Sequence, residues 1–338
     1  MFKKIYQLLK ETIQEEYKFI LFLILLYIIF QIPVNYYITI GGGTSNVATR
    51  IKVEDAYKSK GSFNISYVSQ LEGTLLTYAM SYIVPTWERE SADDYKYTTE
   101  ESIDDIEFRS DLDLKTANST ATYWAYHLAG KTIEEIDSKI YVIVVSPENP
   151  TTLKVKDELI AIDGKSFQKI DEYKDYLQTK KENDSVKVTV KRNNKEKEIA
   201  AKLYKEKDRI ILGVVLQYEK VYKTNPDVSI KFKRSESGPS GGLITTLEIY
   251  NQLTKKDITK GKKIAGTGTI EMDGTIGEIG GIEHKILGAS KDKVDYFLVP
   301  SGQNYKDALK YKKDKKLKIK LIEVKTIQDA LEKLEELE

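Results

Sequence analysis

A glycine-rich turn followed by a helical apolar stripe limits how the last third of this chain can fold. The turn spans residues 238–242 and reads Gly-Pro-Ser-Gly-Gly. Leu243, Leu247 and Tyr250 then recur at helical spacing, which predicts a helix that begins at or just after Ser240. The first turn of a helix carries free backbone N–H groups and the positive end of the helix dipole. Ser240 therefore lies where an oxyanion formed by its attack would be stabilised.

A lysine 45 residues after this serine has small and apolar neighbours. On a helix, the positions one turn before and one turn after Lys285 are Gly281, Ile282, Gly288 and Ala289. That face offers no charge partner, so burial would favour the neutral amine. Only a neutral lysine can take a proton from a serine hydroxyl, and a shift of about three pKa units costs roughly 4 kcal/mol. Ser240 and Lys285 are thus predicted to be a nucleophile and its base.

His284 is the other candidate base in this region. One residue along a helix rotates a side chain by about 100°, so His284 points in a different direction from Lys285. The sequence indicates no acidic residue that would orient the imidazole ring. Taken alone, the glycine-rich turn is also compatible with a structural helix cap, and a lone lysine on a helix usually faces solvent. The pair is preferred because both features occur together.

These features resemble the proteolytic domain of the Lon protease family. The block 267–281 is similar to the glycine-punctuated connection that leads into the lysine helix of that family. The resemblance covers residues 206–338. It implies a Lon-type α/β proteolytic domain with a serine–lysine dyad, in which Ser240 is the nucleophile and Lys285 is the base.

Thr267 and Gly241 are predicted accessory residues. Thr267 matches a Lon-family threonine that lies near the lysine, and the resemblance implies its role. A strand threonine that only packs beside the site is the alternative. Gly241 leaves room for a substrate backbone to approach closely.

An apolar run near the N-terminus indicates a membrane segment. Residues 19–30 are uninterrupted apolar or aromatic residues, and tyrosines follow before residue 40. The stretch 18–40 is long enough to span a bilayer, which predicts a transmembrane anchor; a signal peptide is the alternative, but no small-residue cleavage site follows closely. The basic residues before the run are Lys3, Lys4, Lys10 and Lys18. They predict a cytoplasmic N-terminus over 1–17 and an extracellular catalytic domain.

Residues 41–132 form an N-terminal ectodomain segment with weaker signals. We interpret 41–43 as a flexible glycine exit from the anchor, 61–68 as a strand and 71–83 as compatible with a helix. The acidic stretch 88–113 is interpreted as a solvated face. Helical spacing before Gly130 predicts a further helix.

Residues 133–205 resemble a PDZ domain. Strands over 140–145, 155–162 and 186–190, with a helix over 171–178, follow in the order typical of that domain. Lys156 departs from the pattern, because a glycine is usual there. The resemblance implies that the domain adds an extended peptide to a sheet edge beside a helix. The alternative is a domain that only packs against the protease, and no carboxylate-binding loop of the usual sequence occurs.

Composition excludes several other classes of function. Lys plus Arg total 53 and Asp plus Glu total 52, a formal net charge of +1, so no nucleic-acid partner is expected. The chain has no cysteine and only two histidines, and neither a metal nor another cofactor is expected. It contains no Gly-x-x-x-x-Gly-Lys-Ser/Thr sequence, so no ATP-binding P-loop is predicted.

Together these features resemble the membrane-anchored, PDZ-containing Lon-like peptidases of Gram-positive bacteria. The expected fold class is α+β multidomain, with an N-terminal transmembrane helix, a β-rich PDZ-like domain and a Lon-type α/β proteolytic domain over 206–338. The expected function is an ATP-independent serine endopeptidase, which cleaves peptides or unstructured protein segments outside the cytoplasmic membrane with help from the PDZ-like domain. A non-catalytic membrane-anchored peptide-binding scaffold and a self-processing regulator remain open as alternatives. Formation of a homo-oligomer is also left open.

Overall fold

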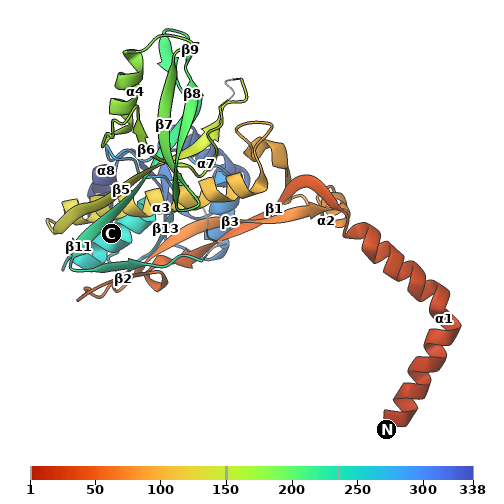
Figure 1. The fold of residues 1–338 in the computed structure, drawn as a ribbon. Coiled ribbons are helices and arrows are strands. Elements are labelled where there is room, and N and C mark those ends of the chain that lie inside the picture. Colours follow the sequence, from red (N-terminus) through yellow and green to blue (C-terminus); the bar gives the residue numbers. More distant parts are fainter. Residues whose placement is uncertain (1, 149–150, 234–235, 237, 338) are drawn as a thin grey trace. The chain divides into compact units, whose positions relative to one another are not determined.

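The computed structural model describes residues 2–148, 151–233, 236 and 238–337, and it divides into two compact units (Figure 1). The smaller unit contains residues 1–41 and 68–95, and the larger contains residues 42–67 and 96–338. Residues 1 and 338, the ends of the first and last predicted segments, lie outside the described residues. Strands β1 (Pro33–Asn46) and β3 (Ser62–Thr74) each run from one unit into the other.

The smaller unit contains parts of β1 and β3, the strand β4, two α-helices and a 3-10 helix. β1 runs antiparallel to β4, with Tyr36 opposite Ser91. The hydroxyl of Thr74 accepts a hydrogen bond from the N–H of Thr77 and caps the short helix α2. The helix predicted within 71–83 is shorter than expected, because β3 continues as far as Thr74. The elements are α1 (Phe2–Phe30), α2 (Leu75–Met80), β4 (Glu88–Ser91) and the 3-10 helix η2 (Ala92–Tyr95).

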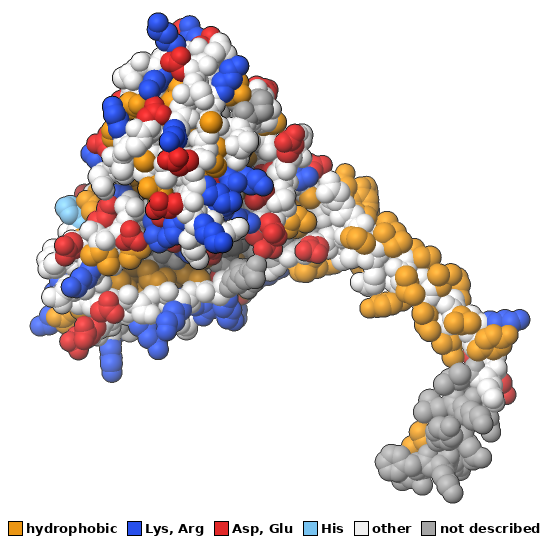
Figure 2. Space-filling model, viewed as in Figure 1, with side chains coloured by type: hydrophobic (Ala, Val, Ile, Leu, Met, Phe, Trp, Pro, Cys, Tyr) orange, Lys and Arg blue, Asp and Glu red, His pale blue; other side chains and the backbone are white. Residues whose placement is uncertain are grey.

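The transmembrane anchor predicted over 18–40 is not supported. α1 ends at Phe30 and residues from Pro33 onward belong to β1, so the tyrosines expected at a membrane interface lie in a strand. Among the described residues, no helix has both the length and the apolar character needed to cross a bilayer. Apolar side chains in the described part of α1 are exposed (Figure 2), among them Leu21 at 58% and Tyr27 at 65%.

The larger unit is built on parallel strands in the order β15-β14-β13-β3. The sequence Tyr-Phe-Leu-Val-Pro of β14 is buried throughout, as expected for a parallel strand covered on both faces. An antiparallel pair places β2 beside β12, with Ile51 opposite Ile230. The strands are β2 (Ile51–Val53), β12 (Val228–Ile230), β13 (Lys263–Gly266), β14 (Tyr296–Pro300) and β15 (Lys320–Val324). The helices are η1 (Val47–Thr49), α3 (Ile103–Leu128), η3 (Pro239–Gly241), α5 (Gly242–Leu253), α6 (Ile282–Lys291), α7 (Gln303–Asp314) and α8 (Ile327–Glu335).

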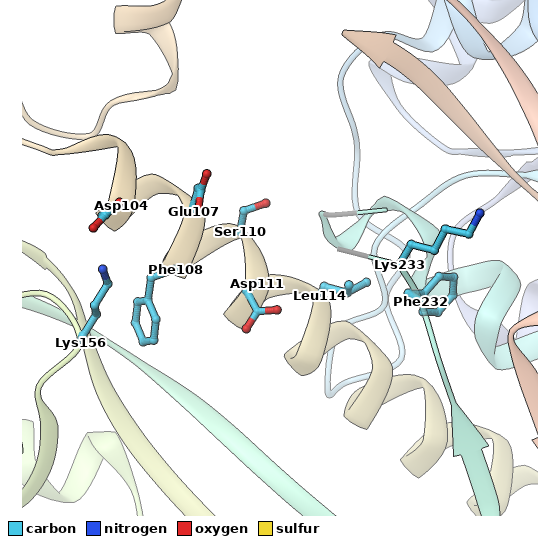
Figure 3. A pocket seen from close by; sticks show the side chains of 9 residues that line it. All are labelled: Asp104, Glu107, Phe108, Ser110, Asp111, Leu114, Lys156, Phe232 and Lys233. Atoms are coloured by element: carbon cyan, nitrogen blue, oxygen red, sulfur yellow. The ribbon is translucent and has the colours of Figure 1, made fainter. Parts of the chain in front are cut away.

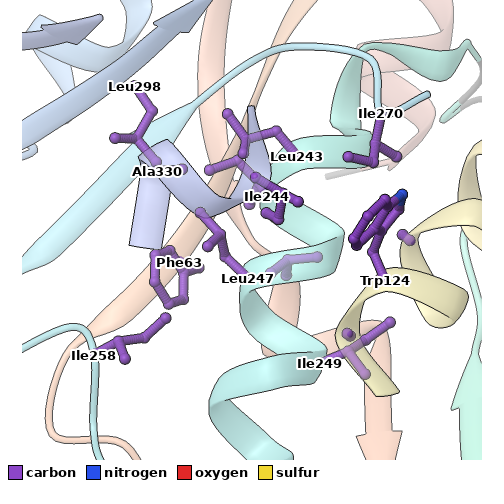
Figure 4. Packing of buried hydrophobic residues seen from close by; sticks show 14 of the residues in the cluster. Phe63, Trp124, Leu243, Ile244, Leu247, Ile249, Ile258, Ile270, Leu298 and Ala330 are labelled. Carbon is purple, nitrogen blue, oxygen red and sulfur yellow. The ribbon is translucent and has the colours of Figure 1, made fainter. Parts of the chain in front are cut away.

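One hydrophobic core joins segments that lie far apart in the sequence. Phe63 of β3 and Trp124 of α3 pack in the same cluster as Leu243 and Leu247 of α5 (Figure 4). The predicted strand over 61–68 and the helix before Gly130 are confirmed by β3 and α3. Both elements contribute to the core of the C-terminal third, although the sequence analysis placed them in a separate segment.

Two predictions for this region are wrong. Gly42 lies in β1 rather than in a flexible exit, and a Cβ there would lie 2.3 Å from the carbonyl oxygen of Tyr67. Its lack of a side chain allows the close approach of another backbone. The acidic stretch 88–113 is not only a solvated face, because the carboxylate of Glu101 forms a buried ion pair with Arg109.

A separate five-stranded sheet, in the order β11-β5-β6-β7-β8, surrounds a second core of the larger unit. The strands and the helix predicted within 133–205 are confirmed. β11 pairs along β5, from Val214 opposite Val145 to Asn225 opposite Thr132. This sheet is therefore an insertion between α3 and β12. Its elements are β5 (Thr132–Val145), β6 (Glu158–Ile162), α4 (Ile170–Gln178), β7 (Ser185–Arg192), β8 (Lys195–Lys202) and β11 (Val214–Asn225), with a hairpin of β9 (Tyr204–Glu206) and β10 (Arg209–Ile211).

Candidate active site

Ser240 lies in the 3-10 turn η3, which leads directly into α5 as predicted. The backbone carbonyl of Ser240 accepts hydrogen bonds from the N–H of Gly268 at 2.8 Å and from the hydroxyl of Thr267 at 3.1 Å. A Cβ on Gly242 would lie 2.7 Å from the side chain of Ile270. The serine turn is therefore packed tightly against the loop that follows β13.

The structure brings Lys285 of α6 into contact with this serine. Lys285 Nζ lies 3.0 Å from Ser240 Oγ and 3.1 Å from Thr267 Oγ1, and the lysine is only 4% exposed. α6 meets β1 at very short range, because a Cβ on Gly288 would lie 2.5 Å from the backbone of Gly42. The small residues beside the lysine thus set how deeply α6 packs, in addition to making its surroundings apolar.

Burial lowers the pKa of Lys285 from its ordinary 10.5 to about 8. Desolvation is the cause of this shift. At pH 7 roughly a tenth of lysines with such a pKa are neutral, against fewer than about one in a thousand for a free lysine. Acceptance of a proton from a neighbouring hydroxyl requires this neutral form.

The accessory residues and His284 take different positions around this pair. Thr267 is fully buried, and its hydroxyl contacts both the Lys285 amine and the Ser240 carbonyl. This arrangement favours a role in the site over packing alone. Gly241 has a φ of −90°, and a Cβ there would lie 3.0 Å from a β3 side chain, so its small size serves packing. His284 is buried on α6, and Lys285 makes the contact with the serine hydroxyl.

The loop between β13 and α6 is anchored by residues that the sequence analysis did not identify. Trp124 Nε1 donates to the carbonyl of Glu271 at 2.9 Å. Near the other end of the loop, Asn304 accepts the N–H of Ile279 at 2.8 Å and donates to its carbonyl at 3.0 Å. These partners are 147 and 25 positions apart in the chain, so no local sequence signal marks them.

A cavity of about 810 Å³ lies beside α3 and the segment that precedes the serine turn (Figure 3). Lys156, where the PDZ pattern usually has glycine, has a φ of 77°, and its Nζ lies 3.9 Å from Asp105 Oδ1. A cavity of this size can hold several residues of an extended polypeptide. Its lining mixes carboxylates with apolar side chains: Asp104, Glu107, Phe108, Ser110, Asp111, Leu114, Lys156, Phe232 and Lys233.

Comparisons with known proteins identify two domains in the larger unit. Residues 218–336 match the model of the Lon protease (S16) C-terminal proteolytic domain, and residues 129–203 match that of the PDZ domain. The Lon protease of Neorickettsia sennetsu is 32% identical over 97 residues, which are 29% of this chain and 11% of that protein. The Lon protease of Clostridium acetobutylicum is 30% identical over 117 residues, which are 34% of this chain and 15% of that protein.

The PDZ region has solved relatives. The PDZ domain of the SdrC-like protein from Listeria monocytogenes is 31% identical and covers 23% of this chain and 85% of that structure, with a TM-score of 0.22. The chain spans only 11% to 15% of the length of the two Lon proteases named above. Residues 218–336 carry a Lon-type proteolytic domain, which is the domain of a serine endopeptidase, and residues 129–203 carry a PDZ domain.

Proposed function

We propose that this chain is an ATP-independent serine endopeptidase in which Ser240 and Lys285 form the catalytic dyad. The observation that carries the proposal is the 3.0 Å contact between Lys285 Nζ and Ser240 Oγ, with the lysine 4% exposed. Burial raises the neutral fraction of the amine, which is the form that can act as a base. The lack of a P-loop sequence in this chain supports independence from ATP.

The proposed reaction begins when Ser240 Oγ attacks a peptide carbonyl carbon and gives its proton to Lys285 Nζ. The Thr267 hydroxyl, 3.1 Å from that amine, fixes its position. Backbone N–H groups of the serine turn η3, together with the dipole of α5, stabilise the oxyanion, since the N–H groups of Gly242 and Leu243 already donate to Pro239 and Gly268. The C–N bond then breaks, and the lysine passes its proton to the leaving amine. Water attacks the acyl-enzyme with Lys285 again as the base, which releases the acid product and restores the serine.

The proposed substrates are peptides and unstructured protein segments. The cavity beside α3 supports this choice, because it offers room for an extended chain near the segment that leads to Ser240. β11 is an edge strand of the PDZ sheet and is followed in the chain by β12 and the serine turn. We infer that the PDZ domain presents substrate by strand addition at such an edge.

The decisive experiment incubates the full chain with an unstructured protein in the absence of ATP, beside the variants Ser240→Ala and Lys285→Ala. Cleavage by the parent chain alone, with covalent labelling of Ser240 by a serine-reactive probe, is the expected result. Cleavage by the Ser240→Ala variant would refute the dyad. Neither cleavage nor labelling would favour the binding scaffold, and cleavage of the chain itself alone would favour the self-processing regulator.

We further propose that the chain associates with the cell membrane through α1 and that the proteolytic domain lies outside the cell. The exposed apolar side chains of α1 and the lysines that precede them support this location. The chain should appear in the membrane fraction, and protease added to intact cells should degrade it. The double variant Leu21→Glu/Leu25→Glu should shift it to the soluble fraction. A parent chain that is already soluble and is protected from external protease would contradict the proposal.

A further inference from the structure

An ion pair between Arg50 and Glu236 joins the N-terminal part of the proteolytic fold to the segment before the serine turn. Arg50 Nε lies 3.1 and 2.9 Å from the two carboxylate oxygens of Glu236, and Arg50 Nη2 lies 2.5 Å from Oε1. A contact of this two-pronged kind is the strong form of an arginine–carboxylate interaction. The hydrogen bond from Arg50 lowers the pKa of Glu236, so the carboxylate remains charged at neutral pH.

The same carboxylate closes a turn within its own segment. Glu236 Oε2 accepts the backbone N–H of Lys233 at 2.8 Å, and the N–H of Glu236 donates to the carbonyl of Lys233 at 2.8 Å. The pairing of β2 with β12 brings Arg50 to this turn, and the N–H of Lys231 donates to the Arg50 carbonyl at 2.9 Å. The backbone and the side chain of Arg50 therefore both bind the segment that follows β12.

The other end of this connection is fixed at Ser240, whose carbonyl is bound by Gly268 and Thr267. Between the two fixed ends, Gly238 has a φ of 90°, a conformation that favours glycine. Glycine brings no side chain that could brace the turn. The position of Ser240 Oγ relative to Lys285 therefore depends on the contacts at both ends.

We propose that Arg50 and Glu236 are positioning residues, which hold the serine turn within reach of Lys285; this inference rests on the proposed function. Their side chains are 20% and 29% exposed, so solvent screening reduces what the pair contributes to folding stability. The rate of a reaction depends far more steeply on the placement of the reacting atoms, since a displacement of about 1 Å can cost about 100-fold. The pair therefore acts mainly on catalysis.

Variants of the full chain separate these two effects. Arg50→Met and Glu236→Gln should each lower kcat about tenfold, with KM changed less than about twofold. Because the two residues act through one contact, the double variant should be no slower than the slower single variant. Arg50→Lys keeps the charge but loses the two-pronged geometry, so its kcat should lie between those of the parent and Arg50→Met.

A matched control and a measurement that needs no activity complete the test. Lys180 and Asp163 form an ion pair of similar exposure, 28% and 26%, within the PDZ domain, so Lys180→Met should leave kcat unchanged. Backbone hydrogen exchange over residues 228–242 should become faster in Arg50→Met and should not change in Lys180→Met.

Equal kcat and equal exchange in Arg50→Met and Lys180→Met would overturn the inference. If the two decreases in kcat multiply in the double variant, the inference is also overturned, because the two residues would then act separately. The proposed function fails in a different way. If the parent chain neither cleaves nor labels at Ser240, the chemistry is absent, and the exchange measurement still decides whether Arg50 holds the turn.

Discussion

At the level of single residues, the buried amine of Lys285 makes activity depend on pH. Burial lowers the pKa of Lys285 to about 8, and the neutral amine is the form that can act as the proposed base. The neutral fraction rises with pH, so kcat/KM should rise roughly tenfold per pH unit below pH 8 and level off above it. Cleavage of an unstructured fluorogenic peptide between pH 6 and 9.5 measures this profile. A flat profile, with chemistry shown to be rate-limiting, would contradict Lys285 as the base.

Burial of the Lys285 amine also lowers the free energy of unfolding. Between about pH 8 and 10.5 the unfolded chain binds a proton at Lys285 that the folded chain has lost, so stability should rise with pH across this window. Below pH 8 the amine is charged in both states, and the full cost of its burial, about 3 kcal/mol, is present.

Lys285→Met should therefore be inactive yet more stable than the parent at pH 7. The gain should be at most about 2 kcal/mol, because the two hydrogen bonds that are lost contribute about 0.5–1.5 kcal/mol each. Urea unfolding of both chains at pH 7 measures the difference. A variant less stable than the parent would show that the buried amine does not destabilise the folded state.

At the level of elements, the close contact between α6 and β1 determines where Lys285 sits. A Cβ on Gly288 would lie 2.5 Å from the backbone of Gly42 and Gly43. These backbone atoms cannot shift as easily as the end of a flexible side chain. Gly288→Ala should destabilise the protein by about 1–3 kcal/mol and should slow cleavage, because α6 must move away from β1 and Lys285 moves with it. Gly280→Ala is the matched control, since a Cβ at Gly280 meets nothing within 4 Å. Urea unfolding and cleavage rates that are equal in the two variants would contradict this account.

Whether the sequence predicts a feature of these elements depends on how far apart in the chain the interacting residues lie. The turn at Ser240, the helix after it and the surroundings of Lys285 are local patterns, and the structure brings both side chains together as predicted. The contributions of Phe63 and Trp124 depend on partners more than a hundred positions away, and no local pattern marks them. Gly42 was misinterpreted for the same reason, since the backbones that require its small size belong to Tyr67 of β3 and His284 of α6.

At the level of the whole molecule, the PDZ domain is an insertion in the proteolytic fold. α3 precedes the PDZ sheet in the chain and β12 follows it, yet α3 packs against α5 and the serine turn. β3 pairs with β13 in parallel, although 200 residues separate Asn64 from Ile264, which it contacts. The proteolytic fold is therefore assembled from both sides of the PDZ domain, and residues 218–336 alone lack part of its core.

The predicted domain 206–338 should consequently fail to fold when it is made alone. It would expose the β13 edge that pairs with β3, and it would leave the apolar face of α5 without Phe63 and Trp124. Removal of the PDZ domain should disturb folding far less, provided that a turn joins β5 to β11 at two residues that face each other in the sheet. Lys139 lies opposite Glu219, so an Asn-Gly pair in place of residues 140–218 can form a two-residue hairpin turn.

This shortened chain should unfold cooperatively in urea and should still react with a serine-reactive probe at Ser240, whereas the fragment 206–338 should do neither. Loss of the PDZ domain should raise KM for unstructured proteins more than for short peptides, because it removes presentation of the substrate and leaves the dyad in place. A cooperative transition in the fragment would show that the C-terminal third supplies its own core. Unchanged KM for both substrates in the shortened chain would leave the PDZ domain with a packing role only.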